Sequence, residues 1–264
     1  SCSRLGLVRS MTKPQNEGNL PLLEHLIELR DRLLRAILSI LVIFCGLFYF
    51  ANDIYEIVSK PIRDQLPEGS SMIATDITAT FFAPFKLTLM VSLFLAMPVV
   101  LHQIWKFVSP GLYAREKRLA IPMLISSILL FYSGIAFAHF VIFPLIMEFF
   151  TNIGPASVEI TPDITQYLAI ALKLFFAFGL AFEIPIAVML VIWSGAATVA
   201  SLSDKRPYIV VGCFIFGMLL TPPDPFSQSM LAIPMWMLFE VGLLFGRLVD
   251  KSRKDKQEQE EAET

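Results

Sequence analysis

Residues 105–118 read WKFVSPGLYAREKR and lie between two long apolar stretches, residues 81–104 and 119–143. The segment holds four basic side chains and a single acid, Glu116. Basic loops between membrane spans mark the cytoplasmic side of a bilayer, so this segment indicates both a fold class and an orientation. An acid inside such a loop also suggests a site that receives a cationic partner.

The composition is that of a membrane protein. Of the 264 residues, 55% are hydrophobic and only 17% are charged, and the mean hydropathy is +0.65. A soluble domain of this length needs far more polar surface. The three cysteines lie in apolar runs or in the polar leader and give no disulfide framework. We therefore predict an all-α polytopic membrane protein.

The hydropathy pattern predicts six transmembrane helices, because crossing about 30 Å of hydrocarbon takes about 20 helical residues. The candidate spans are residues 33–51, 81–104, 119–143, 166–193, 208–220 and 230–246. The fifth and sixth are short, and a helix over residues 208–220 reaches only about 20 Å. Prolines predict that the long helices are bent and form a concave wall; they are Pro98, Pro122, Pro144, Pro185 and Pro234.

The basic residues predict that both termini lie in the cytoplasm. With this topology, 17 of the 21 Lys and Arg residues fall in inner segments, and the outer loops hold only Lys60 and Arg63. Lys86 and Lys173 lie within spans, each near the outer end, where a long side chain can reach the interface. The excess of inner positive charge fixes the expected orientation.

We expect three regions along the chain. Residues 1–19 form a disordered leader, residues 20–248 the six-span domain, and residues 249–264 a charged cytoplasmic tail that is disordered or weakly helical. In the first outer loop, apolar residues at helical spacing predict an interfacial helix over residues 52–66.

Sequence signatures of soluble enzymes are missing. The chain contains no phosphate-binding loop, no HExxH, no GxSxG and no Cys/His cluster with metal-ligand spacing. We therefore expect no enzymatic activity, no cofactor and no metal site, and any energy for transport must come from elsewhere.

Glu28 is the first candidate site residue. It lies in HLIELRDR, residues 25–32, on an amphipathic helix that enters the first span. One interpretation is a ligand-binding carboxylate. The other is an internal pair with Arg32 one turn later, worth about 0.2–0.5 kcal/mol when exposed. The pattern alone slightly favours the internal pair.

Glu116 is the second candidate. Ser109 and Pro110 are typical of a helix cap and first helical position, which would place Glu116 in the second turn of the third span's helix, near the membrane surface. A carboxylate there can accept a bidentate guanidinium. A local bridge to Lys106, Lys117 or Arg118 is equally compatible with the pattern.

Glu183, in LAFEIPIAV, is the third candidate because it lies inside the fourth span. An ionisable group at such depth is costly to bury, so a functional role is the default hypothesis. Its partner could be a polar group of a substrate, a water-filled cavity or Lys173, although Lys173 is about 15 Å away along the helix. Glu240 in the sixth span lies two turns from Arg247, and reaching toward the interface explains it adequately.

Five segments in order resemble the signature segments of the TatC family of twin-arginine protein translocase subunits. They are HLIELRDRL, FVSPGLYAREKR, FGLAFEIP, KRPYIVVG and GMLLTPPDPFSQ, and the similarity extends over roughly residues 20–248. The resemblance implies a receptor core in the bacterial cytoplasmic (inner) membrane. It would bind twin-arginine signal peptides at the cytoplasmic face and, with single-span TatA- and TatB-like partners, support export of folded proteins driven by the proton-motive force.

The resemblance also implies roles for individual residues. Glu28 and Glu116 would bind the two arginines of the signal peptide, with Phe107 on the same surface, and Glu183 would be the polar point within the concave face. Further family positions would be partner-helix contacts at Met218, Thr221 and Gln228 and outer-loop positions at Pro61 and Asp224. Self-association would also be expected.

Two other functions remain as alternatives at this stage. A proton-coupled secondary transporter of a small solute would use Glu183 as its proton site, and it should show broken helices and inverted repeats at the midplane. The sequence contains no convincing repeat. A purely structural scaffold would not need Glu183 or the isolated Glu116.

Overall fold

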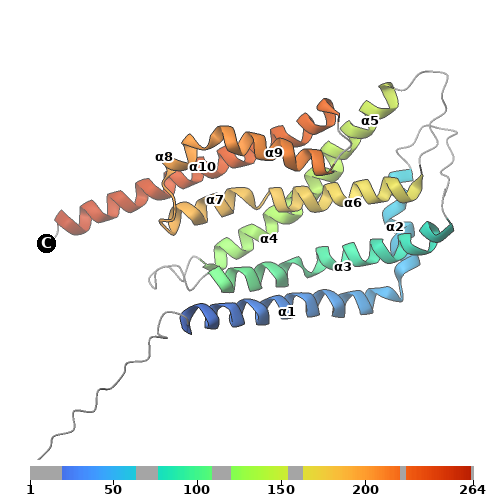
Figure 1. The fold of residues 1–264 in the computed structure, drawn as a ribbon, viewed down its shortest axis with the longest axis horizontal. Coiled ribbons are helices and arrows are strands. Elements are labelled where there is room, and N and C mark those ends of the chain that lie inside the picture. The colour runs from blue at the N-terminus through green and yellow to red at the C-terminus, as the bar shows by residue number, and fades with distance from the viewer. Residues whose placement is uncertain (1–19, 64–76, 109–119, 154–162, 221–223, 263–264) are drawn as a thin grey trace, which may run out of the picture.

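The computed structural model describes residues 20–63, 77–108, 120–153, 163–220 and 224–262, and every element in these ranges is helical (Figure 1). This confirms the all-α prediction. The elements are α1 (Leu20–Phe48), α2 (Ala51–Arg63), α3 (Ile77–Val108), α4 (Ala120–Phe137), the π-helix η3 (Ala138–Ile142), α5 (Phe143–Ile153), α6 (Ile164–Ala181), α7 (Ile184–Trp193), α8 (Val199–Asp204), α9 (Arg206–Leu220) and α10 (Pro225–Ala262). The predicted leader, residues 1–19, lies outside the described residues.

Four helical segments of the described chain are long and apolar enough to cross a membrane: Phe81–Phe107, Ile121–Phe149, Thr165–Trp193 and Pro225–Leu248. A fifth is possible if α1 and α2 count together, although the chain turns by 91° between them. The remaining apolar helix, α9, has 15 residues. The apolar segments therefore occur where six spans were expected, while the count of six stays a prediction.

The last two apolar helices differ from one another in length. α9 is short, as predicted, and at about 1.5 Å per residue it reaches only about 22 Å. The apolar part of α10, in contrast, runs for 24 residues from Pro225 to Leu248, so the prediction of a short sixth span is wrong. The helix starts earlier because Asp224 caps it and a proline fits its first position.

Beyond Leu248 the backbone of α10 continues as a helix through Ala262, where the sequence suggested a disordered or weakly helical tail. This segment is rich in Lys, Glu and Gln, which are good helix formers. Extending an existing helix also avoids the cost of nucleating a new one.

Two of the long helices continue through their prolines, and two other prolines lie beside irregular segments. α3 contains Pro84 and Pro98, and α10 contains Pro234. Near Pro144 the regular helix gives way to the π-helix Ala138–Ile142, which accommodates a residue that cannot donate a backbone hydrogen bond. At Glu183 the fourth span breaks into α6 and α7, two residues before Pro185.

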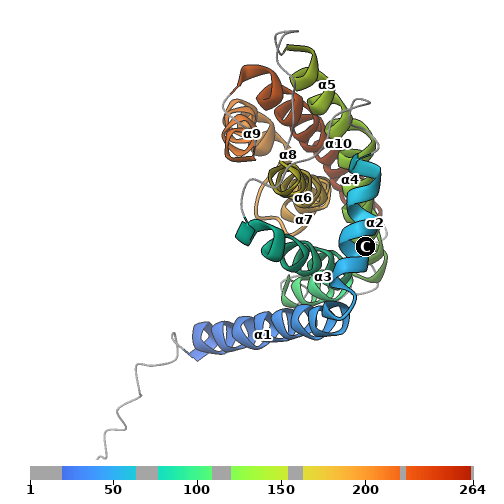
Figure 2. The same ribbon diagram turned by 90° about the vertical axis from the view of Figure 1, so that its right-hand side faces the viewer.

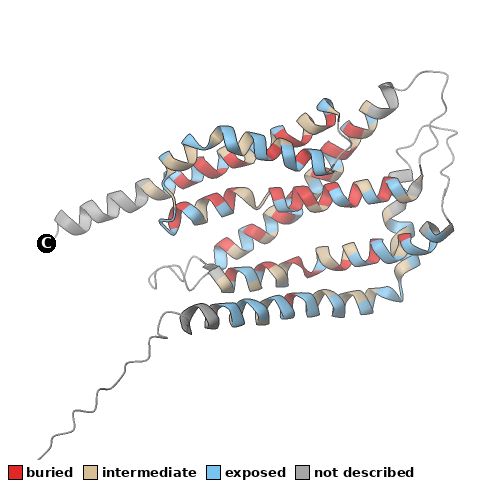
Figure 3. Ribbon diagram, viewed as in Figure 1, coloured by how far each residue is buried: buried red, intermediate tan, exposed pale blue. Residues whose placement is uncertain are grey.

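The helices form a curved row rather than a closed bundle (Figure 2). α1 packs against α3 at one end of the row, α4 packs against α6 in the middle, and α10 packs against α7 and α9 at the other end. Most of α1 is exposed along its length (Figure 3). Its exposed side chains include Leu33, Leu34, Leu38 and Leu41. Together they form an apolar surface that is suited to contact with lipid rather than water.

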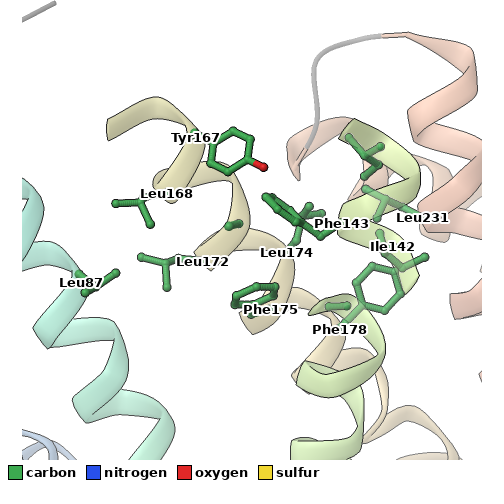
Figure 4. Packing of buried hydrophobic residues seen from close by; sticks show 13 residues of the cluster. Leu87, Ile142, Phe143, Tyr167, Leu168, Leu172, Leu174, Phe175, Phe178 and Leu231 are labelled. Atoms are coloured by element: carbon green, nitrogen blue, oxygen red, sulfur yellow. The ribbon is translucent and has the colours of Figure 1, made fainter. Parts of the chain in front are cut away.

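The largest buried cluster lies around α6 (Figure 4). Leu174 and Phe178 of α6 are fully buried, and they pack in one cluster with Ile142 of η3 and Phe143 of α5. Leu87 of α3 and Leu231 of α10 complete the cluster from both sides. α6 is therefore the helix at the centre of this cluster, with α3 and α10 on its two sides.

The segments predicted to face the cytoplasm lie at one end of the molecule. The start of α1, the end of α3, the start of α4, α8 and the end of α10 all lie at the left in Figure 1. The first outer helix, α2, lies at the opposite end. It spans Ala51–Arg63, close to the helix predicted for residues 52–66.

Candidate functional site

A cleft of about 510 Å³ opens between the first half of α1 and the last turns of α3. Its walls carry both signs of charge, and they comprise Ile27, Glu28, Asp31, Arg32, Arg35, Gln103 and Lys106. Packing of α1 on α3 creates the cleft, so residues about 75 positions apart in sequence share one surface. It is a polar cavity beside an otherwise apolar helix pair.

Within the cleft, Glu28 forms an ion pair with Arg32 one turn later on α1. Arg32 is mostly buried, and its Nη1 also donates to the backbone oxygen of Gln103 at 3.4 Å, which ties α1 to α3. The Glu28 side chain keeps 39% of its surface exposed. The internal pair considered from the sequence is therefore formed, and the carboxylate remains accessible from the cleft.

The neighbouring charges separate into two groups. Arg30, which is not part of the cleft wall, donates from Nη2 to Oδ1 of Asp31 at 2.8 Å, and both of these side chains are exposed. Phe107 is half-buried and directly follows Lys106, which lines the cleft. Glu116 lies outside the described residues, so its closeness to Glu28 stays a prediction.

Glu183 lies at the junction of α6 and α7, within the 29-residue span Thr165–Trp193. Its backbone N–H donates to Leu180 O at 3.0 Å, a tighter turn than an α-helix, and Pro185 has no N–H to continue the ladder. The local break results from this sequence, and it places a carboxyl group at the point where the helix is interrupted.

The side chain of Glu183 has a partner that sequence reasoning missed. Ser127 of α4 donates its hydroxyl to Glu183 Oε2 at 2.7 Å, and Trp105 of α3 donates its indole N–H to the same hydroxyl at 3.2 Å. The other carboxyl oxygen, Oε1, is buried and has no hydrogen-bond partner among the described residues. The only sequence signal was a serine within an apolar span.

The surroundings of this group are apolar. Trp105 belongs to a buried cluster with Phe131, Ile186 and Trp193, contributed by α3, α4 and α7. A polar group in such surroundings is stable only when it is hydrogen-bonded. The chain from Trp105 through Ser127 therefore satisfies one of the two carboxyl oxygens, while the other is buried without a partner among the described residues.

Two of the three predicted partner-helix residues are described, Met218 on α9 and Gln228 on α10. Met218 is 49% exposed. Gln228 is turned inward, because its Nε2 donates to the backbone oxygen of Phe214 at 2.8 Å. Thr221 lies outside the described residues. The Met218 side chain is therefore exposed on the surface, whereas the Gln228 amide is hydrogen-bonded to the backbone of α9.

The two predicted outer-loop positions both lie at helix ends. Pro61 lies in the last turn of α2, where only the backbone is described. Asp224 caps α10: its Oδ2 accepts from the backbone N–H of Ser227 at 2.7 Å. A structural role is therefore visible for Asp224.

Comparison with known proteins gives consistent results. A family model described as "Sec-independent protein translocase protein (TatC)" matches residues 24–234. The chain is 59% identical over 234 residues to the Sec-independent protein translocase protein TatC of Azotobacter chroococcum mcd 1, covering 89% of this chain and 92% of that one. It is 53% identical over 242 residues to the protein of the same name from Escherichia coli (strain K12), covering 92% and 94%.

A solved structure supports the fold as well. The crystal structure described as "Twin Arginine Translocase Receptor- TatC" superposes with a TM-score of 0.77 at 38% sequence identity. The match covers 85% of this chain and 98% of that one. The polytopic helical architecture is therefore shared along nearly the whole of the solved chain.

Proposed function

Since this chain belongs to the TatC family of Sec-independent protein translocase proteins, we propose that it is the receptor core of a twin-arginine export system. It is a non-catalytic membrane component of a protein translocase. In our proposal it binds twin-arginine signal peptides at the cytoplasmic face of the bacterial inner membrane. Both termini lie on that side, as the distribution of Lys and Arg predicts.

The observation that carries this proposal is the cleft around Glu28. A guanidinium is bound best by a carboxylate that accepts two parallel hydrogen bonds, and a carboxylate has about four lone-pair positions. The contact of Arg32 with Glu28 supports this proposal, because it pairs the same two chemical groups in the cleft. An arginine of the signal peptide would share or replace that contact, and Glu116 would bind the second arginine beside Phe107.

The other family positions enter the proposal as contacts for partner proteins. Met218, Thr221 and Gln228 would receive single-span TatA- and TatB-like subunits along α9 and α10, and Pro61 and Asp224 would shape the outer face. Glu183 would act within the bilayer during transport driven by the proton-motive force. The break at Glu183 also fits the solute-transporter alternative, but membership of a protein translocase family favours protein export.

Photocrosslinking of a twin-arginine signal peptide to membranes that carry the chain tests the proposal. Glu28→Arg and Glu116→Arg should each reduce crosslinking strongly, because each puts a positive charge where an arginine must bind. Asp204→Arg is the matched control, since Asp204 is exposed at the end of α8 on the same side of the molecule. Undiminished crosslinking in both glutamate variants, at equal protein levels, would refute the recognition patch.

A further inference from the structure

Three helices contribute one side chain each to a hydrogen-bonded chain within the membrane domain. Trp105 of α3 donates to Ser127 of α4 at 3.2 Å, and Ser127 donates to Glu183 at 2.7 Å. An indole N–H can only donate, so the serine oxygen must accept at that contact. The single hydroxyl proton of Ser127 is then free to go to the carboxyl group. When Oε2 carries no proton, both hydrogen bonds therefore run in one direction, from Trp105 through Ser127 to Glu183.

We propose that Trp105 and Ser127 are positioning residues for Glu183: they hold its Oε2 and leave the buried Oε1, which has no partner among the described residues, as the acceptor for a hydrogen-bond donor on an inserting segment that parts the surrounding side chains. This inference rests on the proposed function, in which Glu183 takes part in transport. It adds two residues whose side-chain hydrogen bonds form one chain that ends on that carboxyl group.

The burial of the two residues supports this role. Ser127 is 1% exposed and Trp105 is 6% exposed, so water cannot replace either contact without opening the helix packing. Removing the Ser127 hydroxyl would leave both the indole N–H and Oε2 without a partner, and buried polar groups without partners are costly. A carboxyl group freed in this way would rotate to find another donor, and Oε1 would no longer be presented in a fixed direction.

The neighbouring residues provide matched controls. Ser126 precedes Ser127 on the same helix but is exposed. Trp193 lies in the same buried cluster as Trp105 and is 5% exposed. Ser126→Ala and Trp193→Phe therefore repeat the chemical changes of Ser127→Ala and Trp105→Phe without breaking the chain to Glu183.

The test measures export of a folded reporter in cells and the carboxyl infrared bands of the purified protein. We expect Ser127→Ala and Trp105→Phe to lower the export rate several-fold, and Ser127→Thr, which keeps the hydroxyl, to restore it. Ser127→Ala combined with Glu183→Gln should export no more slowly than Glu183→Gln alone. The band that Glu183→Gln removes should shift in Ser127→Ala and Trp105→Phe but not in the two controls.

The outcomes separate the two hypotheses. If Glu183→Gln slows export but Ser127→Ala does not, the positioning role is wrong while the role of Glu183 stands. If Glu183→Gln exports at the normal rate, the proposed role of Glu183 fails and the inference fails with it. An unshifted infrared band in Ser127→Ala also overturns the inference, whatever the export rate, because that measurement needs only folded protein.

Discussion

Arg206, the first residue of α9, and Glu240 in α10 form an ion pair through two hydrogen bonds. Nε contacts Oε1 at 2.6 Å and Nη2 contacts Oε2 at 2.8 Å. This corrects the sequence interpretation, in which Glu240 only reached toward the interface near Arg247. Farther along α9, Gln228 of α10 bonds to the backbone of Phe214. Two polar contacts at different positions along α9 therefore attach this short helix to α10.

Breaking the Arg206–Glu240 pair should weaken the attachment of α9. We expect Arg206→Ala and Glu240→Ala each to lower the midpoint of thermal unfolding in detergent, because each leaves a charged partner in a half-buried position. The exchanged pair Arg206→Glu with Glu240→Arg should recover part of the loss. Lys205→Ala, an equal change of charge at the exposed preceding residue, should have little effect. If the exchanged double variant is no more stable than the single variants, the ion pair does not contribute to the attachment of α9.

Gly134 permits the close approach of α4 and α6. A Cβ at this position would overlap the backbone oxygen of Phe178 and lie 2.9 Å from its carbonyl carbon. Gly134→Ala should therefore lower the free energy of unfolding by about 1–3 kcal/mol, the usual cost of overpacking. Gly212→Ala is the control: nothing lies within 4 Å of its Cβ, and it should stabilise helix α9 by about 0.5–1 kcal/mol. Denaturant unfolding in detergent measures both, and equal effects would argue against close helix packing at Gly134.

Asp224 should matter through its side-chain oxygen at the start of α10. Losing a helix cap costs about 1 kcal/mol, so Asp224→Ala should lower stability by about that amount. Asp224→Asn retains an acceptor for the Ser227 N–H and should remain close to the original stability. Export of a folded reporter can be measured on the same two variants. If Asn and Ala are equally destabilising, the negative charge and not the cap is what matters.

The sequence predicted those features that depend on local composition. The apolar stretches predicted the long helices, and Pro144 and Pro185 lie beside the irregular segments at Ala138–Ile142 and at Glu183, whereas α3 and α10 continue through their prolines. Apolar content put the start of the sixth span at residue 230, whereas the helix itself begins at Pro225, directly after the cap at Asp224. A span defined by hydropathy alone therefore leaves out the first turn of the helix, which an Asp-Pro pair marks in the sequence.

The partners of the polar groups could not be predicted in the same way. Glu183 meets Ser127, 56 residues earlier, and Arg206 meets Glu240, 34 residues later. Such pairs depend on which helices pack together and on their rotation about their own axes, neither of which follows from one helix's periodicity. Glu28 and Arg32 are the contrasting case, since one helical turn joins them and the spacing suggested the pair.

The partner-helix proposal can be tested with two methionines in different environments. Met218 on α9 is 49% exposed, whereas Met235 on α10 is 2% exposed. In a chain with Cys2, Cys45 and Cys213 replaced by alanine, Met218→Cys should form a disulfide with a cysteine placed in the membrane segment of a TatA- or TatB-like partner.

Met235→Cys should crosslink at least several-fold less under the same oxidant, because its side chain is enclosed by the neighbouring helices. Its thiol should become reactive only after denaturation, which confirms that the cysteine is present. The exposed surface around Met218 continues through Ile215 and Leu219, both large apolar residues that an apolar membrane helix can cover. The measurement is made in membranes that contain this chain and the partner. If Met218→Cys crosslinks no faster than Met235→Cys there, the partner does not contact this face of α9.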